Sequence, residues 1–216
     1  MSDRTKPALQ PRTLRTRANL IDALEALLKT REFEQISVAD IAAKAGVSVG
    51  SVYSHFKDKD AFLEELLLRR KATIEERLLQ SEATDMTTVL KAQGDLHAAL
   101  LLVSRSAFEQ VRMDAHIIRA THTYARLNPE FIDKDWQAFA DRSFSSLRLV
   151  LDIYADQITR PDMEEAAKMI NYFFSVIFVR TALFQNGTLF TSHAPSDDAL
   201  VHEAADMAYG YLCHAA

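Results

Sequence analysis

Cysteine, glycine and proline are scarce in this 216-residue chain, which contains one Cys, five Gly and five Pro. The lone Cys213 excludes an internal disulfide or a cysteine-rich metal site and fits a reducing cytoplasm. Few turn formers, and no sustained alternating runs of Val, Ile and Thr, indicate an all-helical protein. A phosphate-cradling glycine-rich loop and a nucleophile elbow are both lacking, so we expect neither an enzyme nor a bound cofactor.

Long uninterrupted apolar runs are also lacking. The basic N-terminus is not followed by the apolar stretch that a secretory signal needs. Residues 161–185 are apolar nearly all round, but Lys168, Asn171 and Arg180 interrupt them, so this segment predicts a buried helix and not a membrane span. We therefore expect a cytoplasmic protein.

The net charge of −5 is unevenly distributed along the chain. Residues 1–17 carry five basic side chains against one acidic side chain, Asp3. A basic N-terminus beside an otherwise acidic chain is typical of a region that meets a polyanion. Residues 1–13 are interpreted as a flexible basic arm, which either adds contacts to nucleic acid or serves only as a solubilising tail.

Residues 37–59 contain the most informative pattern. Ser37 followed by Asp40 predicts a capping box at the start of a short helix, and Gly46 stands where a left-handed residue would end it. Ser48 can then cap a second helix running to about His55. With a supporting helix at residues 14–30, this predicts a helix-turn-helix DNA-binding domain over residues 14–60.

The second helix of this motif exposes small and hydrogen-bonding side chains, which suits the DNA major groove better than a protein core. Gly50 inside a helix costs about 1 kcal/mol relative to Ala, so something should approach it closely. Val49 offers only an apolar contact, such as to a thymine methyl group, and the operator sequence therefore cannot be read from this helix. The pattern itself predicts that Val49, Gly50, Ser51, Tyr53, His55 and Lys59 meet DNA, and the resemblance described next adds Ser37, Lys44 and Ser48.

This stretch resembles the DNA-binding domain of the TetR family of bacterial transcriptional regulators. The resemblance rests on a series of landmarks in fixed order: Ser37, Ile41-Ala42, Ala45-Gly46-Val47-Ser48, Gly50, Tyr53, His55-Phe56, Lys59 and Leu63. It implies that Ser37, Tyr53, His55 and Lys59 bind phosphates, and that Lys44 and residues 48–51 lie where base edges are read. It also implies a homodimer on a palindromic operator and a small-molecule effector.

The remaining chain predicts a C-terminal helical domain, for about nine helices in all. Residues 61–80 are expected to form a connecting helix, and residues 81–216 a ligand-binding and dimerisation domain. Within it we expect helices at residues 88–111, 114–126, 129–157, 161–185 and from residue 196 onward. The histidines in this region have no spacing typical of a metal site, so no metal is predicted.

Residues 108–190 are rich in aromatic side chains, which fits either ordinary close packing or the ligand cavity that the resemblance implies. Such a cavity would suit a hydrophobic or aromatic molecule. The predicted pocket residues are Phe108, His116, His122, Trp136, Phe139, Ser143, Asn171, Tyr172 and Ser175.

A helix that is apolar on every side needs packing partners on every side, so the last two helices predict a contact with a second copy of the chain. The predicted dimer residues are Phe174, Phe178, Ala204, Ala208 and Tyr211. The expected function is a ligand-responsive repressor. A transcriptional activator, a ligand-independent architectural DNA-binding protein and, more remotely, an all-helical enzyme remain as alternatives.

Overall fold

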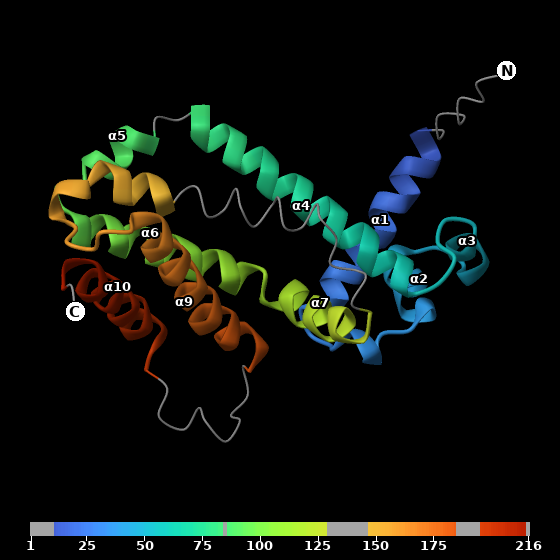
Figure 1. Cartoon of the computed structure of the whole chain (residues 1–216). Helices are drawn as coiled ribbons and strands as arrows, with labels where there is room; N and C mark the ends of the chain where they lie inside the picture. The colour runs from blue at the N-terminus through green and yellow to red at the C-terminus, as the bar shows by residue number, and fades with distance from the viewer. Residues whose placement is uncertain (1–10, 84–85, 129–146, 185–194, 215–216) are drawn as a thin grey trace, which may run out of the picture. The chain divides into compact units, whose positions relative to one another are not determined.

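The computed structural model describes residues 11–83, 86–128, 147–184 and 195–214. Within these ranges every regular element is helical, which confirms the predicted all-helical class. The chain divides into two compact units, Met1–Arg70 and Lys71–Ala216, and the division falls inside the 24-residue helix α4 (Asp60–Ala83). Figure 1 shows the element order along the chain.

The first unit contains α1 (Pro11–Leu28), a 3-10 turn (Phe33–Gln35), α2 (Val38–Ala45), α3 (Val49–Tyr53) and the start of α4. α1 begins three residues earlier than predicted and takes in residues 11–13, which the sequence assigned to the basic arm. Its apolar stripe is buried against the other helices. The core side chains of this unit come from all of its helices: Leu20, Leu24, Leu28, Phe33, Ile36, Ile41, Val52, Phe56, Phe62, Leu63 and Leu66.

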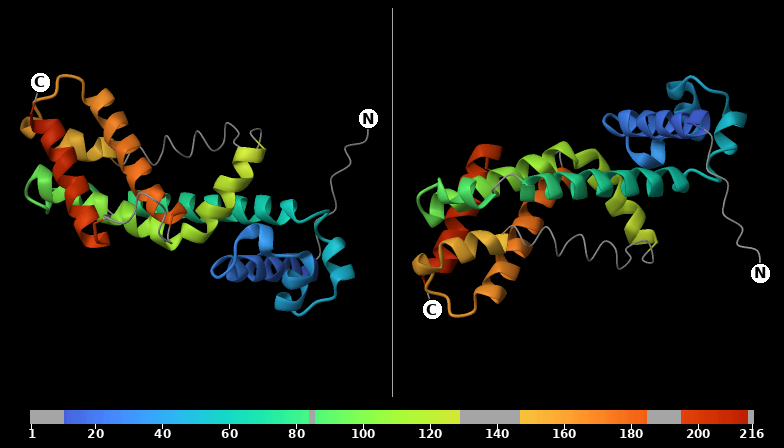
Figure 2. Two further views of the ribbon diagram at one scale, coloured as in Figure 1. Left: turned by 90° about the horizontal axis from the view of Figure 1, so that it is seen from below. Right: turned by 90° about the horizontal axis from the view of Figure 1, so that it is seen from above.

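The second unit continues with α5 (Met86–Lys91), α6 (Leu96–Met113), α7 (Ala115–Leu127) and a helical segment at residues 147–153. A 3-10 turn (Ala155–Gln157), α9 (Met163–Leu183) and α10 (Asp197–Cys213) complete it. α9 and α10 both pack against α6, which therefore forms the centre of the described part of this unit; the three helices can be followed in Figure 2.

The predicted continuous helix over residues 88–111 is wrong, because the chain turns between α5 and α6. Gly94 has φ +89°, a left-handed conformation that side chains other than glycine rarely adopt. Asp95 then caps α6, its carboxylate accepting a hydrogen bond from the Ala98 amide at 2.8 Å. Gly94 followed by Asp95 indicates a helix end and a new helix start. The prediction missed it because the apolar periodicity continues on both sides.

Two further helix starts can be compared with the prediction. Asp162 caps α9, accepting from the Glu165 amide at 3.0 Å, so the helix begins just after Pro161 and not at it. Ser196 caps α10 as expected, accepting from the Ala199 amide at 3.3 Å. The predicted helix start at Pro129 lies outside the described residues.

By length and composition alone, α9 could cross a membrane, although the sequence argument excluded this on the ground of its polar interruptions. The core helix of a soluble protein meets the same criterion. One side of α9 does serve as a core: Ala166, Ile170, Phe174, Phe178 and Ala182 are all buried among the other helices of the unit.

Candidate nucleic-acid interface

The capping box predicted at the start of α2 is present. The Ser37 hydroxyl accepts a hydrogen bond from the Asp40 amide at 3.1 Å, and the Asp40 carboxylate accepts one from the Ser37 amide at 2.7 Å. The same hydroxyl donates to the Asp40 carboxylate at 2.7 Å. Because these contacts occupy the free amides at the helix start, they fix where α2 begins and where the exposed Ser37 is presented.

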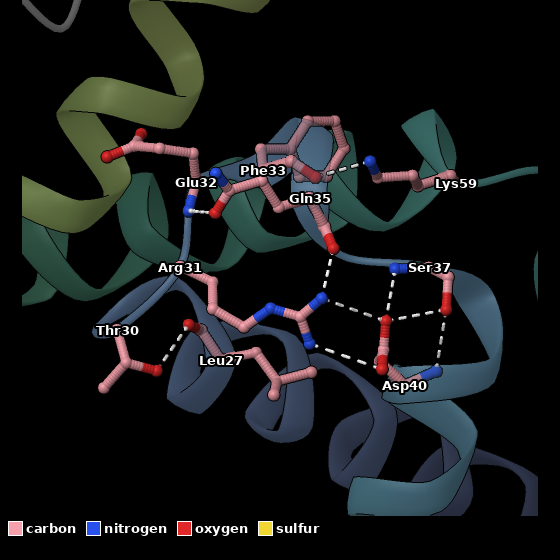
Figure 3. Close-up of polar contacts among 9 residues, drawn as sticks. All are labelled: Leu27, Thr30, Arg31, Glu32, Phe33, Gln35, Ser37, Asp40 and Lys59. Carbon is pink, nitrogen blue, oxygen red and sulfur yellow. Dashed lines mark hydrogen bonds and ion pairs between the residues drawn. The ribbon is translucent and has the colours of Figure 1, made fainter.

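Arg31 extends this cap into a network that joins the end of α1 to the start of α2 (Figure 3). Its guanidinium pairs with the Asp40 carboxylate at 3.3 Å and donates to the carbonyl of Gln35. Hydrogen bonds from Ser37, followed by that from Arg31, hold the pKa of Asp40 well below its usual value. The acid therefore stays ionised and keeps accepting these bonds.

The turn between α2 and α3 has the geometry that its sequence predicts. Gly46 has φ +70°, the left-handed conformation of a helix-ending glycine, and its amide donates to the carbonyl of Ala43 at 3.2 Å. The amide of Val47 donates to the carbonyl of Ala42 at 3.0 Å. The Ser48 hydroxyl then accepts from the Ser51 amide at 3.2 Å and starts α3. α2, this turn and α3 together form a helix-turn-helix.

The helix α3 spans only five residues and buries one of them, Val52. Val49 and Tyr53 are exposed, at 41% and 57% of their surface. A Cβ atom built on Gly50 would meet no atom of the chain within 4 Å. The chain's own packing therefore does not require glycine at this position. The small exposed surface at the start of α3 leaves room for another molecule to come close.

Lys59, predicted to bind phosphate, is engaged with its own domain. Its amine donates to the carbonyl of Phe33 and lies 4.2 Å from the centre of that residue's ring (Figure 3). Partial burial lowers the pKa of Lys59. The predicted phosphate contact of Lys59 thus requires its amine to leave Phe33 or to be shared. Lys44, in contrast, is exposed in the last turn of α2.

The structure brings forward one residue that the sequence analysis counted only as part of the basic N-terminus. The Arg17 guanidinium, on α1, donates to the His55 carbonyl at 3.0 Å and pairs with Glu65 on α4 at 2.7 Å. It also lies 4.5 Å from the centre of the Phe56 ring. No local spacing signals these contacts, because they join residues 38 and 48 positions apart.

The predicted pocket residues do not gather around one described cavity. Trp136, Phe139 and Ser143 lie outside the described residues. Phe108 is buried, His116 and Asn171 are half-buried, and His122, Tyr172 and Ser175 are exposed. Phe108 borders a depression between α6 and α10, whose other lining residues are mainly charged: Arg105, Glu109, Arg112, Asp197, Asp198 and Val201.

Four of the five predicted dimer residues face the interior of their own domain. Phe174, Phe178, Ala204 and Ala208 are at most 5% exposed and belong to its core, and Tyr211 is half-buried. The pattern of α9 and α10 could not tell their inner face from their outer one. The large apolar side chains that these helices expose are Met169, Tyr172, Val176, Met207 and Tyr209.

Among the described residues, no group of three or more His, Cys, Asp and Glu side chains is arranged to hold a metal ion. The ring nitrogen Nε2 of His97 lies 2.5 Å from the carboxylate of Asp206 on α10. The ring nitrogen Nδ1 of His202 lies 3.5 Å from the carboxylate of Asp198. These histidines therefore form contacts with one carboxylate each, as expected for ties between or along helices.

Residues 20–66 match the sequence model described as "Bacterial regulatory proteins, tetR family". Over these residues the chain is therefore similar to the DNA-binding domain of the TetR family. The matched residues run from α1 through the helix-turn-helix to α4, so the match covers all the predicted DNA-binding residues but not Arg17.

Individual relatives are transcriptional regulators described as HTH-type. The chain is 39% identical over 89 residues to YwcC, an uncharacterised HTH-type transcriptional regulator of Bacillus subtilis, covering 40% of each chain. It is 31% identical over 97 residues to the HTH-type transcriptional repressor BepR of Brucella suis, covering 44% of this chain and 46% of BepR. The chain thus spans less than half the length of these two relatives.

The fold of the whole chain also has a solved counterpart. A putative transcriptional regulator from Saccharomonospora viridis, crystallised in complex with choline, superposes with a TM-score of 0.67 over 90% of this chain and 95% of that one. The two sequences are 18% identical, so this likeness concerns the fold alone.

Proposed function

We propose that this chain is a sequence-specific DNA-binding regulator of the TetR family that represses transcription from a palindromic operator. The observation that carries the proposal is α3, a short capped helix that buries only Val52 and leaves open space around Gly50. A helix with this surface can enter the DNA major groove while the neighbouring polar groups bind the phosphates. The repressor relative BepR favours repression over the alternative of activation.

The direct test starts from a random-sequence pool of double-stranded DNA, from which the purified protein selects its ligand. We expect a palindromic sequence to be enriched at near-physiological salt. Lys44→Ala should then weaken binding to this DNA and reduce its preference over unselected DNA, because Lys44 is proposed to lie where base edges are read. Lys29→Ala, which removes another exposed lysine from the same unit, should change neither quantity. Equal effects of the two substitutions would contradict a specific role for α2 and α3.

The dimer of this proposal uses the outer face of α9 and α10. On α9, the exposed Met169, Tyr172 and Val176 are spaced three and four residues apart and form one apolar stripe, and Met207 is exposed on α10. A second copy of the chain would cover this stripe and set the spacing of two recognition helices on the operator. Light scattering should show a dimer at micromolar concentration, and Val176→Asp should convert it to a monomer. A wild-type monomer would contradict the dimer.

The proposed signal is a small molecule bound in the second unit, which contains most of the aromatic side chains of the chain. The choline complex of the structural relative supports the ability of this fold to hold a small molecule. Binding of the effector would favour a state with the wrong spacing of recognition helices, so that effector and operator weaken each other's binding equally. An effector that leaves operator affinity unchanged would contradict this mechanism while leaving DNA binding intact. We further propose that the protein acts in the cytoplasm.

A further inference from the structure

The end of α3 is held in place by a side chain that comes from neither helix of the motif. The last carbonyl groups of a helix have no partner within it, and the carbonyl of His55, just past α3, accepts its hydrogen bond from Arg17 on α1. His55 and Tyr53, which flank this point, are both proposed to bind phosphate. The position of Arg17 therefore bears directly on where these two groups lie.

Arg17 itself is fixed from two other sides. One of its terminal nitrogens pairs with Glu65 of α4 at 2.7 Å, while the other donates to His55. Its guanidinium faces the Phe56 ring, which in turn stacks on Phe62 of α4 with ring centres 3.9 Å apart. A planar group that makes two separate hydrogen bonds and one ring contact has a defined orientation. It can transmit that orientation to the backbone it holds.

We infer that Arg17 is a positioning residue for DNA recognition, acting through the His55 carbonyl and not by touching DNA. The inference rests on the proposed function and adds to it a residue outside the helix-turn-helix. Its positive charge is already paired with Glu65, so it should add no phosphate contact of its own. This property separates it from the phosphate-binding residues: its loss should lower affinity without changing the number of counterions released.

A matched control exists on the same two helices. Arg69 of α4 pairs with Asp22 and with Glu25 of α1, the latter at 2.7 Å, and so also ties α4 to α1. The side chain of Arg69 is 39% exposed and that of Arg17 29% exposed. Both of these ion pairs lead from α4 to α1. Arg69→Gln therefore reports what the loss of such a tie does to the fold alone.

The experiment uses the full-length protein and the DNA that the wild type selects from a random pool. Arg17→Gln should weaken binding about tenfold per half-site, the scale expected when a fixed group loses one hydrogen bond, with an unchanged salt slope. Arg69→Gln should lower the thermal midpoint of unfolding by about as much as Arg17→Gln does. It should leave the affinity for DNA within about twofold of the wild type. A fall in the salt slope with Arg17→Gln would show a direct phosphate contact and overturn the inference, as would equal loss of affinity in both variants.

Two further variants test the route of the effect. Arg17→Lys keeps the charge but not the planar fork, so it should remain weakened; full affinity in this variant would show that charge alone matters. His55→Ala keeps the backbone carbonyl that Arg17 holds and removes only the imidazole whose position Arg17 is proposed to set. Combined with Arg17→Gln it should therefore cost less than the sum of the two single losses. Additive losses would contradict that route.

The wild-type protein distinguishes the two levels of failure. If it selects no sequence, the proposed function is wrong and the role of Arg17 is wrong with it. If it selects a sequence and Arg17→Gln binds that sequence as tightly as the wild type, only the present inference fails.

Discussion

The two units of this chain are built by different means. In the first unit the two helices of the helix-turn-helix, α2 and α3, are short, and polar side chains hold their ends: Ser37 with Asp40, Ser48 with Ser51, and Arg17 with the His55 carbonyl. In the second unit the described helices are mostly long, and an extended apolar core joins α6, α9 and α10. Charged pairs such as Arg105 with Asp198 lie at the exposed edge of that core.

This difference suits the two proposed tasks. A DNA-reading surface needs backbone and side chains at fixed positions. Many hydrogen bonds within a small region fix these positions. A domain proposed to bind a small molecule and a second copy of the chain needs a large apolar surface, which long apolar helices provide. The following predictions test the difference, beginning with the largest expected effect.

The largest effect is expected from removing a large core side chain of the second unit. Phe178 on α9 is 1% exposed and lies edge to face against Phe108, with ring centres 5.5 Å apart. Phe178→Ala should lower the free energy of unfolding by about 3–5 kcal/mol, measured by urea denaturation. Tyr172→Ala, on the exposed face of the same helix, should change it by less than about 1 kcal/mol at concentrations where the protein is monomeric. Similar losses in the two variants would contradict the assignment of the faces.

The same pair of residues shows what sequence could not decide. α9 is apolar nearly all round, so periodicity gives no inner face, and the prediction placed Phe174 and Phe178 at a dimer contact when they belong to the core. The positions of α6, α7 and α10 determine which side of α9 is covered. The pocket prediction met the same limit, since pocket walls are defined by contacts between helices far apart in the sequence.

The first unit was predicted far better because its signals are local. A serine cap with an acid three residues later, a glycine at the helix end and a second serine cap each act within one turn, and all three are present as expected. What sequence missed there was again non-local: Arg17 reaches 38 residues along the chain to His55. Arg31 reaches Asp40 across the connection between α1 and α2, and no spacing rule indicated it.

Each unit has a described glycine in the left-handed conformation, so the cost of the same Gly→Ala substitution can be compared between the units. Gly46 has φ +70° in the first unit and Gly94 has φ +89° in the second, and neither would meet another atom within 4 Å if it carried a Cβ. Substitution by Ala should therefore cost only backbone strain, about 1–2 kcal/mol at each site. Urea denaturation of both variants measures this. A much larger loss at one site would show that the turn there also controls packing.

Gly50 should respond in the opposite direction. It lies inside α3 without a left-handed φ and with open space around it, so Ala should stabilise the helix by up to about 1 kcal/mol. The same methyl group should weaken DNA binding, because it would stand where base edges approach. Thermal unfolding and binding to the selected DNA measure the two effects on one variant. A Gly50→Ala variant that is more stable and binds DNA with full affinity would contradict the proposed close approach of DNA to α3.

The smallest effects concern the response of stability to acid, and Asp40 provides the larger of the two. The pKa of Asp40 is lowered by its bonds from Ser37 and by Arg31, so its ionised form stabilises the folded state. This contribution should be complete above the ordinary aspartate pKa of about 3.9 and should be lost as the pH falls below that value. Urea denaturation across this range should show Asp40→Asn less stable than the wild type near neutral pH, with the difference closing in acid.

Glu164 in the second unit provides the counterpart to Asp40. A hydrogen bond from Lys168 at 2.8 Å, one turn along α9, lowers the pKa of this exposed carboxyl. The sign of its pH dependence is the same, but a single flexible, solvated partner holds it, whereas Ser37 and Arg31 surround Asp40 with fixed donors. Glu164→Gln should therefore show a smaller difference from the wild type than Asp40→Asn at every pH. A larger one would mean that surface pairs, and not end caps, provide the polar stability of this chain.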